Sequence, residues 1–398
     1  MIEMIPIIIL VIWVLIEVVL KKIVLDVNRN FQWLITKIDE KPTLNKNGLE
    51  KFFKHGYDPE LGWVRKPNTS HEETGKNGKT VWNINDSGAR KNPYCKINNS
   101  KISCYGDSFT FGRQVNDDET WEYYLSQLVQ SNVKNFGVGN YGIDQVLLRL
   151  KREFPKNRTD FVIMGVVPDT VSRIVSVWKH YYEYGNTFGF KPRFKILENK
   201  LLLVNNPIDE ESKFYNYVDY LDEIRENDFF YKNKFKKEII SFPYSISILK
   251  NFKRNIQIIF RVYKNKNAHE IIMKRNLEWR VKLYENKNIV LLLEMIIDEY
   301  VNYSKKEKFQ PIFIFLPQKD DILFIKNNFH FYSEIVKRLE NKSNLVFIDI
   351  MEDFLNYKKL NDLFSENSQY GGHYSKVGNE FVAKLIYDKL NIKFNYKF

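Results

Sequence analysis

The chain has 398 residues, of which 44% are apolar, and its formal net charge is +12. This length and composition indicate a folded protein of one large domain or two domains, and they exclude an intrinsically disordered chain. Only two cysteines occur, Cys95 and Cys104, which excludes a disulfide-rich scaffold. The basic residues are spread along the chain and not interleaved with aromatic residues in dense runs, so we expect no nucleic-acid partner.

The N-terminus carries an apolar segment from Ile5 to Leu20 that only Glu17 interrupts. About 20 apolar residues cross a bilayer, and no basic start or small-residue cleavage site marks a signal peptide. The segment therefore predicts an uncleaved, single-pass membrane anchor over residues 1–25, with a buried core helix as the alternative. Two lysines follow the span and favour a cytoplasmic main domain, but they leave the side of the membrane open.

Residues 26–100 predict a polar connector and an irregular β-rich cap, because Tyr57–Pro93 is rich in Gly, Asn and Pro and holds short strand-like pieces such as Thr80–Ile84. From Lys101 strands and helices alternate. The predicted strands are Ile102–Tyr105, Val133–Phe136, Phe161–Val167, Pro311–Leu316 and Leu345–Ile350. The predicted helices are Thr120–Val129, Asp144–Glu153, Asp169–Lys179, Asp320–Asn341 and Lys376–Leu390. Strands joined by crossover helices imply an α/β fold with a three-layer α/β/α parallel sheet.

An insertion at about residues 181–309 interrupts this alternation within an α/β domain of residues 101–398. It begins with a predicted hairpin over Phe194–Val204, turning at Glu198-Asn199, and is otherwise mostly helical. Its segment Ile239–Tyr263 mixes apolar stretches with Lys and Arg. We expect this segment to pack as a lid, and its alternative is to lie on a membrane surface.

The segment Gly106-Asp107-Ser108 follows the first strand of the α/β domain. Ligands of open α/β sheets bind beyond the carboxyl ends of the strands, where Ser108 is expected to lie. Gly106 permits a tight turn, and the N–H of Ser108 is placed to hold an oxyanion beside its hydroxyl. The segment thus predicts a nucleophilic serine, with an ordinary capping serine as the alternative.

A serine nucleophile needs a base, and of six histidines only His373 lies in a loop just after the last core strand and before the last helix. That loop faces the same edge of the sheet as Ser108. The histidines show no metal-ligand spacing with Cys or carboxylates, so we expect no metal and no cofactor. Cys104, in the strand before the serine, is either a buried thiol or bridged to Cys95.

These segments resemble the SGNH/GDSL hydrolase superfamily over roughly Lys101–Asp169 and Gln310–Leu390. The residues that carry the resemblance are Gly106–Gly112 (GDSFTFG), Asn135–Gln145 (NFGVGNYGIDQ), and His373 with Gly378-Asn379. The preceding segments Leu61–Trp63 and Ile84–Arg90 are similar to members associated with cell-surface polysaccharide modification. The resemblance implies that Ser108 is the nucleophile, that His373 is the base, and that the N–H groups of Ser108 and Asn140 hold the oxyanion, with Gly139 replacing Asn140 after a one-residue shift.

The chain departs from the family pattern in three blocks. Asn140 stands where the second block has glycine, and Asp169 occupies the nearest position to the asparagine of the third block. The acid that precedes the family's histidine is absent, so Glu366, Asp362 or a backbone carbonyl is left to orient His373. Asp107, Asp169 and Glu366 are therefore the candidate helper residues.

We expect a membrane-anchored serine esterase or O-acyltransferase that acts on an acyl ester, which the polysaccharide-linked relatives suggest is attached to carbohydrate. The altered helper residues favour an alternative, a catalytically degenerate glycan-binding or assembly protein on the same fold. A basic protein that binds a membrane surface or nucleic acid is a third hypothesis, based only on the net charge.

Overall fold

The computed structural model describes residues 4–31, 34–94, 100–264 and 268–394. The chain divides into two compact units. The helical unit comprises Met1–Glu50, Ser176–Phe190 and Glu210–Asn276. The sheet unit comprises Lys51–Val175, Lys191–Asp209 and Leu277–Phe398. The sheet unit carries every residue that the sequence proposes for catalysis.

Five parallel strands form the central sheet, in the order β11-β10-β7-β5-β6. Their bounds are β5 (Ile102–Gly106), β6 (Val133–Asn135), β7 (Phe161–Val166), β10 (Gln310–Phe315) and β11 (Val346–Asp349). The three middle strands are buried along almost their whole length, as expected for parallel strands covered on both faces.

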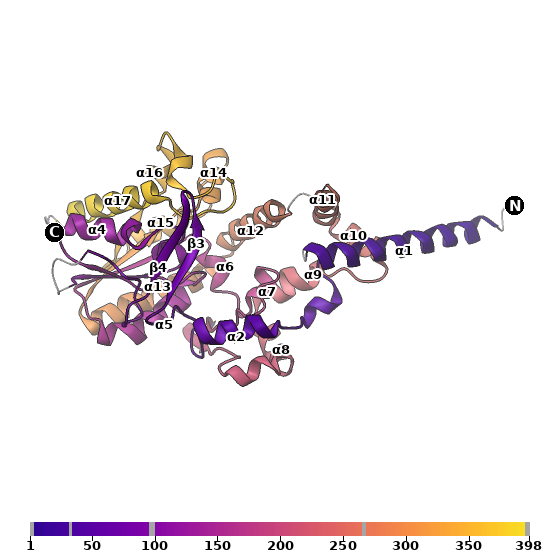
Figure 1. Cartoon of the computed structure of the whole chain (residues 1–398), viewed down its shortest axis with the longest axis horizontal. Helices are drawn as coiled ribbons and strands as arrows, with labels where there is room; N and C mark the ends of the chain where they lie inside the picture. Colours follow the sequence, from indigo (N-terminus) through magenta and orange to yellow (C-terminus); the bar gives the residue numbers. More distant parts are fainter. Residues whose placement is uncertain (1–3, 32–33, 95–99, 265–267, 395–398) are drawn as a thin grey trace. The chain divides into compact units, whose positions relative to one another are not determined.

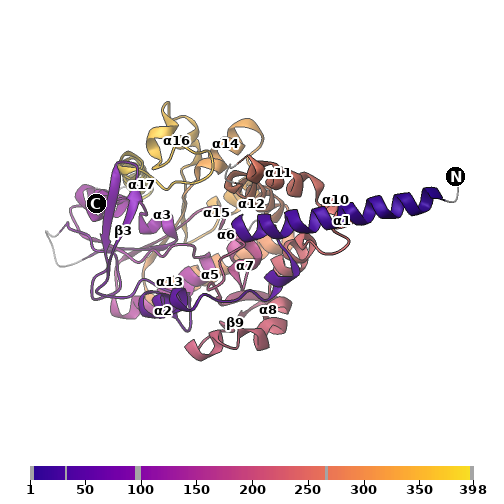
Figure 2. The ribbon, with the colours of Figure 1, turned by 45° about the vertical axis from the view of Figure 1, so that its right-hand side comes forward.

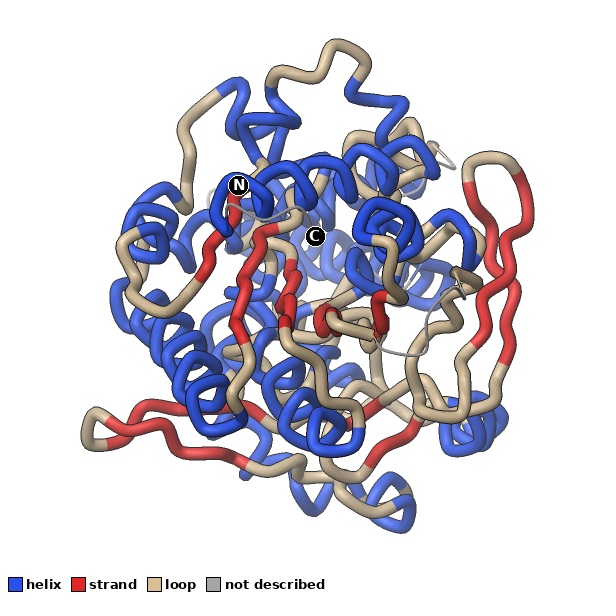
Figure 3. Tube along the Cα trace, turned by 90° about the vertical axis from the view of Figure 1, so that its left-hand side faces the viewer, coloured by secondary structure: helices blue, strands red, loops and turns tan. Residues whose placement is uncertain are grey.

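Helices cover the two faces of this sheet (Figure 3). Right-handed crossovers place the helix after β5 and the helix after β6 on opposite faces, because these two connections run in opposite directions across the sheet. On one face α4 (Trp121–Val129) packs along α17 (Lys376–Phe394). On the other, α13 (Lys287–Glu307) contacts α5 (Ile143–Glu153) and is bridged by ion pairs to α15 (Ser333–Glu340). The predicted three-layer α/β/α fold is confirmed.

The strand order creates a switch point between β5 and β7. The chain leaves β5 toward β6, whereas it leaves β7 in the opposite direction, toward β10. In open sheets of this order, ligands bind in the crevice beyond the carboxyl ends of the two strands at the switch point. Ser108 follows β5 by two residues and Asp169 follows β7 by three, so both begin at this crevice.

Three antiparallel hairpins stand apart from the central sheet. They are β1 (Tyr57–Asp58) with β2 (Gly62–Trp63), β3 (Ser70–Gly75) with β4 (Gly78–Asn83), and β8 (Arg193–Leu197) with β9 (Lys200–Val204). The hairpin predicted at Phe194–Val204 is confirmed. Glu198 and Asn199 both have positive φ, 49° and 59°, which is the backbone of a two-residue hairpin turn.

The remaining α-helices are divided between the two units. In the sheet unit they are α3 (Ser108–Phe111), α6 (Thr170–Arg173), α14 (Lys319–Asn327) and α16 (Met351–Leu355). In the helical unit they are α1 (Met4–Phe31), α7 (Lys179–Tyr182), α8 (Leu221–Asn227), α9 (Lys236–Glu238), α10 (Tyr244–Lys250) and α11 (Phe252–Tyr263). Helices α2 (Lys46–His55) and α12 (His269–Tyr284) cross the boundary between the units. Single 3₁₀ or π turns occur at Lys37–Glu40, Asp117–Glu119, Phe154–Lys156, Glu211–Phe214, Tyr217–Tyr220, Tyr231–Phe235 and Leu360–Leu363.

Two predicted helices are wrong in extent. The helix predicted over Asp320–Asn341 is two helices, α14 and α15, separated by five residues. Between them the neighbours Phe331 and Tyr332 are both buried against Tyr284, with ring centroids 5.5 and 5.8 Å from it. Adjacent residues of one helix point about 100° apart, so the chain breaks the helix to bury both rings.

The helix predicted over Asp169–Lys179 is confined to Thr170–Arg173. Farther on, the N–H groups of Val177 and Trp178 donate to a carboxylate oxygen of Asp228, at 2.7 and 3.0 Å, instead of to carbonyls one turn earlier. A tertiary contact therefore replaces the helical hydrogen bonds.

Within the described residues, one helix is long and apolar enough to cross a membrane. Met4–Leu25 of α1 has a mean hydropathy of 2.6, and only 6% of it is buried. A core helix of a soluble protein would be mostly buried, whereas a signal sequence has the same length and composition. Figures 1 and 2 show α1 running past α10 and continuing toward the N-terminus.

Candidate active site

The turn after β5 sets Ser108 at the start of α3. Asp107 caps this helix, since its Oδ1 accepts a hydrogen bond from the N–H of Phe109 at 2.9 Å. The hydroxyl of Thr110 donates to the carbonyl of Gly165 in β7 at 2.7 Å, which holds α3 down on the sheet. A Cβ on Gly106 would lie 1.9 Å from that same carbonyl oxygen, so glycine is required there for the close approach.

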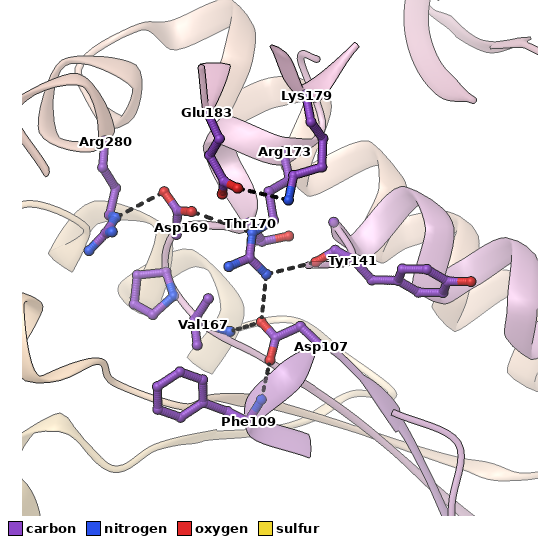
Figure 4. Close-up of polar contacts among 12 residues, drawn as sticks. Asp107, Phe109, Tyr141, Val167, Asp169, Thr170, Arg173, Lys179, Glu183 and Arg280 are labelled. Atoms are coloured by element: carbon purple, nitrogen blue, oxygen red, sulfur yellow. Dashed lines mark hydrogen bonds and ion pairs between the residues drawn. The ribbon is translucent and has the colours of Figure 1, made fainter. Parts of the chain in front are cut away.

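Asp107 is a buried structural carboxylate. Its Oδ2 accepts from the N–H of Val167 at 2.9 Å and from Nη1 of Arg173 at 3.1 Å (Figure 4). Burial raises the pKa of Asp107, against the opposing effect of Arg173 and the two backbone donors. Through Phe109 in its own turn, and through Val167 and Arg173 beyond β7, Asp107 joins the end of β5 to the end of β7.

Asp169 lies between two arginines. Its Oδ1 accepts from Nε of Arg280 at 3.1 Å, and its Oδ2 is 3.4 Å from Nε of Arg173 (Figure 4). A carboxylate in this position would by itself repel an oxyanion. Arg173 and Arg280 thus lie against this charge, and the same two cations are shared with Asp107, Asp320 and Asp321.

The second-block loop lies beside Ser108. A Cβ built on Gly139 would be 3.9 Å from Cβ of Ser108. The carbonyl of Gly139 accepts from the indole of Trp63 at 2.9 Å, and Asn140 has a left-handed backbone with φ +66°. Asparagine tolerates this conformation better than most residues, which accounts for its presence in place of glycine.

Three backbone donors are free at this place. Among the residues that the structure describes, the N–H groups of Ser108, Gly139 and Asn140 donate to no protein acceptor. Buried or half-buried N–H groups are nearly always paired, so free ones beside a serine are suited to an oxyanion.

His373 packs against the residue that follows Ser108. Its ring centroid is 4.7 Å from that of Phe109, and the imidazole is half-buried. The carbonyl of His373 accepts from the N–H of Ser365 at 2.8 Å, which fixes the loop before α17. The prediction that His373 follows directly on the last strand is wrong, because α16 and a 3₁₀ turn lie between.

Gln114, to which no sequence motif points, is the partner of this histidine. Its Oε1 lies 2.9 Å from the backbone N of His373 and 3.2 Å from its Nδ1. Its Nε2 donates to a carboxylate oxygen of Glu366 at 2.9 Å. A backbone N–H can only donate and a carboxylate can only accept, so these two partners fix which end of the amide is oxygen.

This orientation of the amide determines the tautomer of His373. Because Nδ1 faces an oxygen, it carries the proton, and Nε2 keeps the lone pair that a general base requires. The orienting group that the sequence could not identify is thus a side-chain amide. An asparagine amide serves in the same way in papain-like proteases.

The predicted orienting acids take other positions. Glu366 contacts Gln114 and reaches His373 only through it. The backbone carbonyl of Asp362 accepts from the hydroxyl of Ser375 at 2.5 Å. Gln114 has φ +66°, an uncommon conformation for a non-glycine residue and a feature that often marks functional positions.

The charges around His373 keep it neutral. Burial, together with the cations Arg113 and Arg173, lowers the pKa of His373 well below its usual 6.5. A neutral imidazole at physiological pH is the form that accepts a proton from a serine.

Within the described residues no cluster of His, Cys, Asp and Glu could hold a metal ion. Cys104 is a buried free thiol in β5, and burial raises its pKa well above the usual value. Cys95, the other half of the bridge considered above, lies outside the described residues.

No family model matches the chain, and no curated protein matches it. Solved structures do match. A protein described as lipolytic, of the G-D-S-L family, from Desulfitobacterium hafniense DCB-2 has a TM-score of 0.35 at 13% identity, covering 72% of this chain and 98% of its own. The acetyl xylan esterase AlAXEase has a TM-score of 0.34 at 14% sequence identity, and the match again covers 72% of this chain and 98% of the esterase. A salicylyl-acyltransferase from a tetracycline biosynthetic pathway has a TM-score of 0.32 at 13% sequence identity, and the match covers 79% of this chain and 58% of the acyltransferase. Scores and identities this low leave the function to be argued from the site itself.

Proposed function

We propose that this chain is a serine esterase or O-acyltransferase of the SGNH type, held to a membrane by α1 and acting on a carbohydrate-linked acyl ester. The observation that carries the proposal is the amide of Gln114, which holds His373 as the tautomer with a free Nε2. Gln114 belongs to the loop that continues from the Ser108 turn, so one short segment carries the nucleophile and the orienting group.

The reaction begins when Nε2 of His373 takes the proton of the Ser108 hydroxyl as Oγ attacks the acyl carbon. The carbonyl oxygen becomes an oxyanion, held by the N–H of Ser108 with that of Asn140 or Gly139. Collapse expels the alcohol, which takes the proton from the imidazolium, and leaves an acyl-enzyme. Water then gives hydrolysis, and a sugar hydroxyl gives transfer.

The helper residues have supporting roles in this scheme. Asp107 and Arg173 join the ends of β5 and β7, and Arg173 also donates to the carbonyl of Tyr141 at 3.0 Å, which supports the oxyanion loop. Glu366 positions Gln114, and Asp169 is one member of a buried ion cluster with Arg173 and Arg280.

Turnover of 4-nitrophenyl acetate tests the proposal. We expect the wild type to release nitrophenol and Ser108→Ala and His373→Gln to lose at least ~10³-fold in kcat. The matched control is Ser343→Ala, which removes an exposed serine from the turn before β11. A degenerate binding protein would instead show the same background rate in all four proteins.

A further inference from the structure

Arg65 is a cation without a counter-charge. It follows β2, and its guanidinium lies over the rings of Trp82 and Phe111, 4.5 and 5.2 Å from their centroids. Among the residues that the structure describes, it forms no hydrogen bond and no ion pair. The side chain is half-buried, and a guanidinium withdrawn from water usually finds an anionic partner.

This cation lies near the proposed nucleophile. Nη2 of Arg65 is 4.0 Å from the position of a Cβ on Gly139, and that position is 3.9 Å from Cβ of Ser108. Gly139 has no side chain, so nothing from this residue fills the space between the guanidinium and the serine. A group attached to a bound ester can therefore reach Arg65 from Ser108 within a few bonds.

The neighbouring cation is already neutralised. Arg113 lies 4.0 Å from the same position at Gly139, but its Nε and Nη2 donate to one carboxylate oxygen of Glu73 at 3.0 and 2.8 Å. The other oxygen of Glu73 accepts from the N–H of Gln114 at 2.6 Å. Glu73 thus pairs directly with Arg113 and acts on Arg65 only through space.

The charges around Arg65 also favour the binding of an anion. Burial and the positive charge of Arg113 lower its pKa to about 10, and Glu73 opposes this only in part. Arg65 stays protonated at neutral pH. A bound anion would reduce the repulsion between the positive charges of Arg65 and Arg113.

We propose that Arg65 binds an anionic group, a carboxylate or a phosphate, that the ester substrate carries close to its scissile bond. The aromatic rings of Trp82 and Phe111 hold the guanidinium plane in place, so little side-chain entropy is lost when its donors bind two oxygens. This inference rests on the proposed function, because it assigns a substrate class to the same site.

A matched pair of esters tests it. 4-Acetoxybenzoate and its methyl ester share the acetyl group and differ by one negative charge. Wild type should have the higher kcat/KM for 4-acetoxybenzoate. Arg65→Gln should lower that value about 10- to 100-fold and change the methyl ester less than about threefold. 4-Acetoxyphenyl phosphate replaces the carboxylate with a phosphate, and the larger Arg65-dependent ratio identifies the preferred anion.

Two control variants separate charge from packing. Arg65→Lys keeps the charge and should retain part of the preference, whereas Arg338→Gln, on the exposed surface of α15, should leave it unchanged. Equal losses by Arg65→Gln on both esters would mean that Arg65 only packs on its aromatic neighbours, and would overturn the proposal.

Binding of 4-acetamidobenzoate and its methyl ester, measured by saturation-transfer NMR, does not depend on turnover. Arg65-dependent binding of the anion without any ester turnover would overturn the proposed function and keep this inference. Turnover of both esters without an effect of Arg65 on rate or binding would overturn this inference and keep the proposed function.

Discussion

At Nδ1 of His373 a neutral amide, that of Gln114, stands where a Ser-His-Asp triad has a carboxylate. Both groups fix the imidazole, but only a carboxylate stabilises the imidazolium cation that forms during proton transfer. The oxygen of Gln114 has three donors around it, from the backbone N and Nδ1 of His373 and from the hydroxyl of Ser365 at 2.5 Å. Orientation and charge stabilisation are therefore separable in this site by substitution of a single residue.

Gln114→Ala should lower kcat at least about tenfold and at most about 10⁴-fold, because His373 loses the group that fixes its tautomer. Gln114→Glu should retain more activity than Gln114→Ala and should raise the pKa of His373, since a carboxylate then faces Nδ1. The pH profile of kcat/KM with 4-nitrophenyl acetate measures both effects. A Gln114→Ala enzyme with wild-type kcat and an unchanged profile would contradict the orienting role.

The pH dependence follows from the lowered pKa of His373. The base works when neutral, so the acid limb of kcat/KM should lie below pH 6.5, the usual pKa of histidine. Arg113→Gln removes one of the cations that lower this pKa and leaves the carboxylate of Glu73 without that partner. Both changes favour the imidazolium, so the limb should move to higher pH.

The same profile for Arg338→Gln should match the wild type, because that side chain lies on the exposed surface of α15. An acid limb that stays in place in Arg113→Gln would show that the charge of Arg113 does not act on His373.

The sequence supports Ser108 and His373 because each stands in a recognisable segment, and it cannot support Gln114 or Arg65. Gln114 comes within reach of His373 only because the left-handed backbone at its own position turns the chain back. Arg65 can be singled out only in the structure, where among the described residues its guanidinium forms no hydrogen bond and no ion pair. Neither property is a sequence pattern.

At the scale of elements, the α/β alternation was readable because buried strands and amphipathic helices have distinct periods. The split of Asp320–Asn341 was not, since it depends on two rings that pack against Tyr284. Glu17 is a similar case. It interrupts the apolar run of α1, and its carboxylate accepts from the N–H groups of Tyr244 and Ser245 at 2.5 and 2.9 Å.

Glu17→Leu keeps the apolar run intact but leaves these two N–H groups of α10 without an acceptor. Each such loss costs about 1–3 kcal/mol, so amide exchange at Tyr244 and Ser245 should become faster by about tenfold or more. Hydrogen–deuterium exchange on the full chain in detergent measures this. Glu17→Gln, which retains an acceptor oxygen, should show a smaller change, and equal rates in Glu17→Leu and wild type would refute the contact.

At the scale of the whole molecule, the sequence anticipates an N-terminal anchor, a cap and an α/β domain. The 22 residues of Met4–Leu25 rise about 33 Å as a helix, enough for the ~30 Å core of a bilayer. The division into two units could not be foreseen, because segments from three separate parts of the chain assemble each of them. The insertion supplies residues to both, including α13 on the sheet.

The full chain should stay with the membrane pellet after alkaline carbonate extraction, and its intact mass should include residues 1–25. The double variant Ile12→Lys with Leu15→Lys should move it to the soluble fraction, because each lysine costs about 2.5–3.5 kcal/mol in the centre of a span. Leu197→Lys, on the exposed turn of β8–β9, is the matched control and should not. A mature protein that lacks residues 1–25 would identify the segment as a cleaved signal.

A fluorophosphonate probe tests directly whether Ser108 is a nucleophile activated by His373. An activated serine attacks the phosphorus of the probe and expels fluoride, and mass spectrometry of the labelled protein locates the adduct. We expect a single adduct on the peptide that carries Ser108, absent in Ser108→Ala and strongly slowed in His373→Gln, with normal labelling in the exposed control Ser343→Ala. Labelling of wild type that does not exceed Ser108→Ala, with both proteins folded, would contradict it.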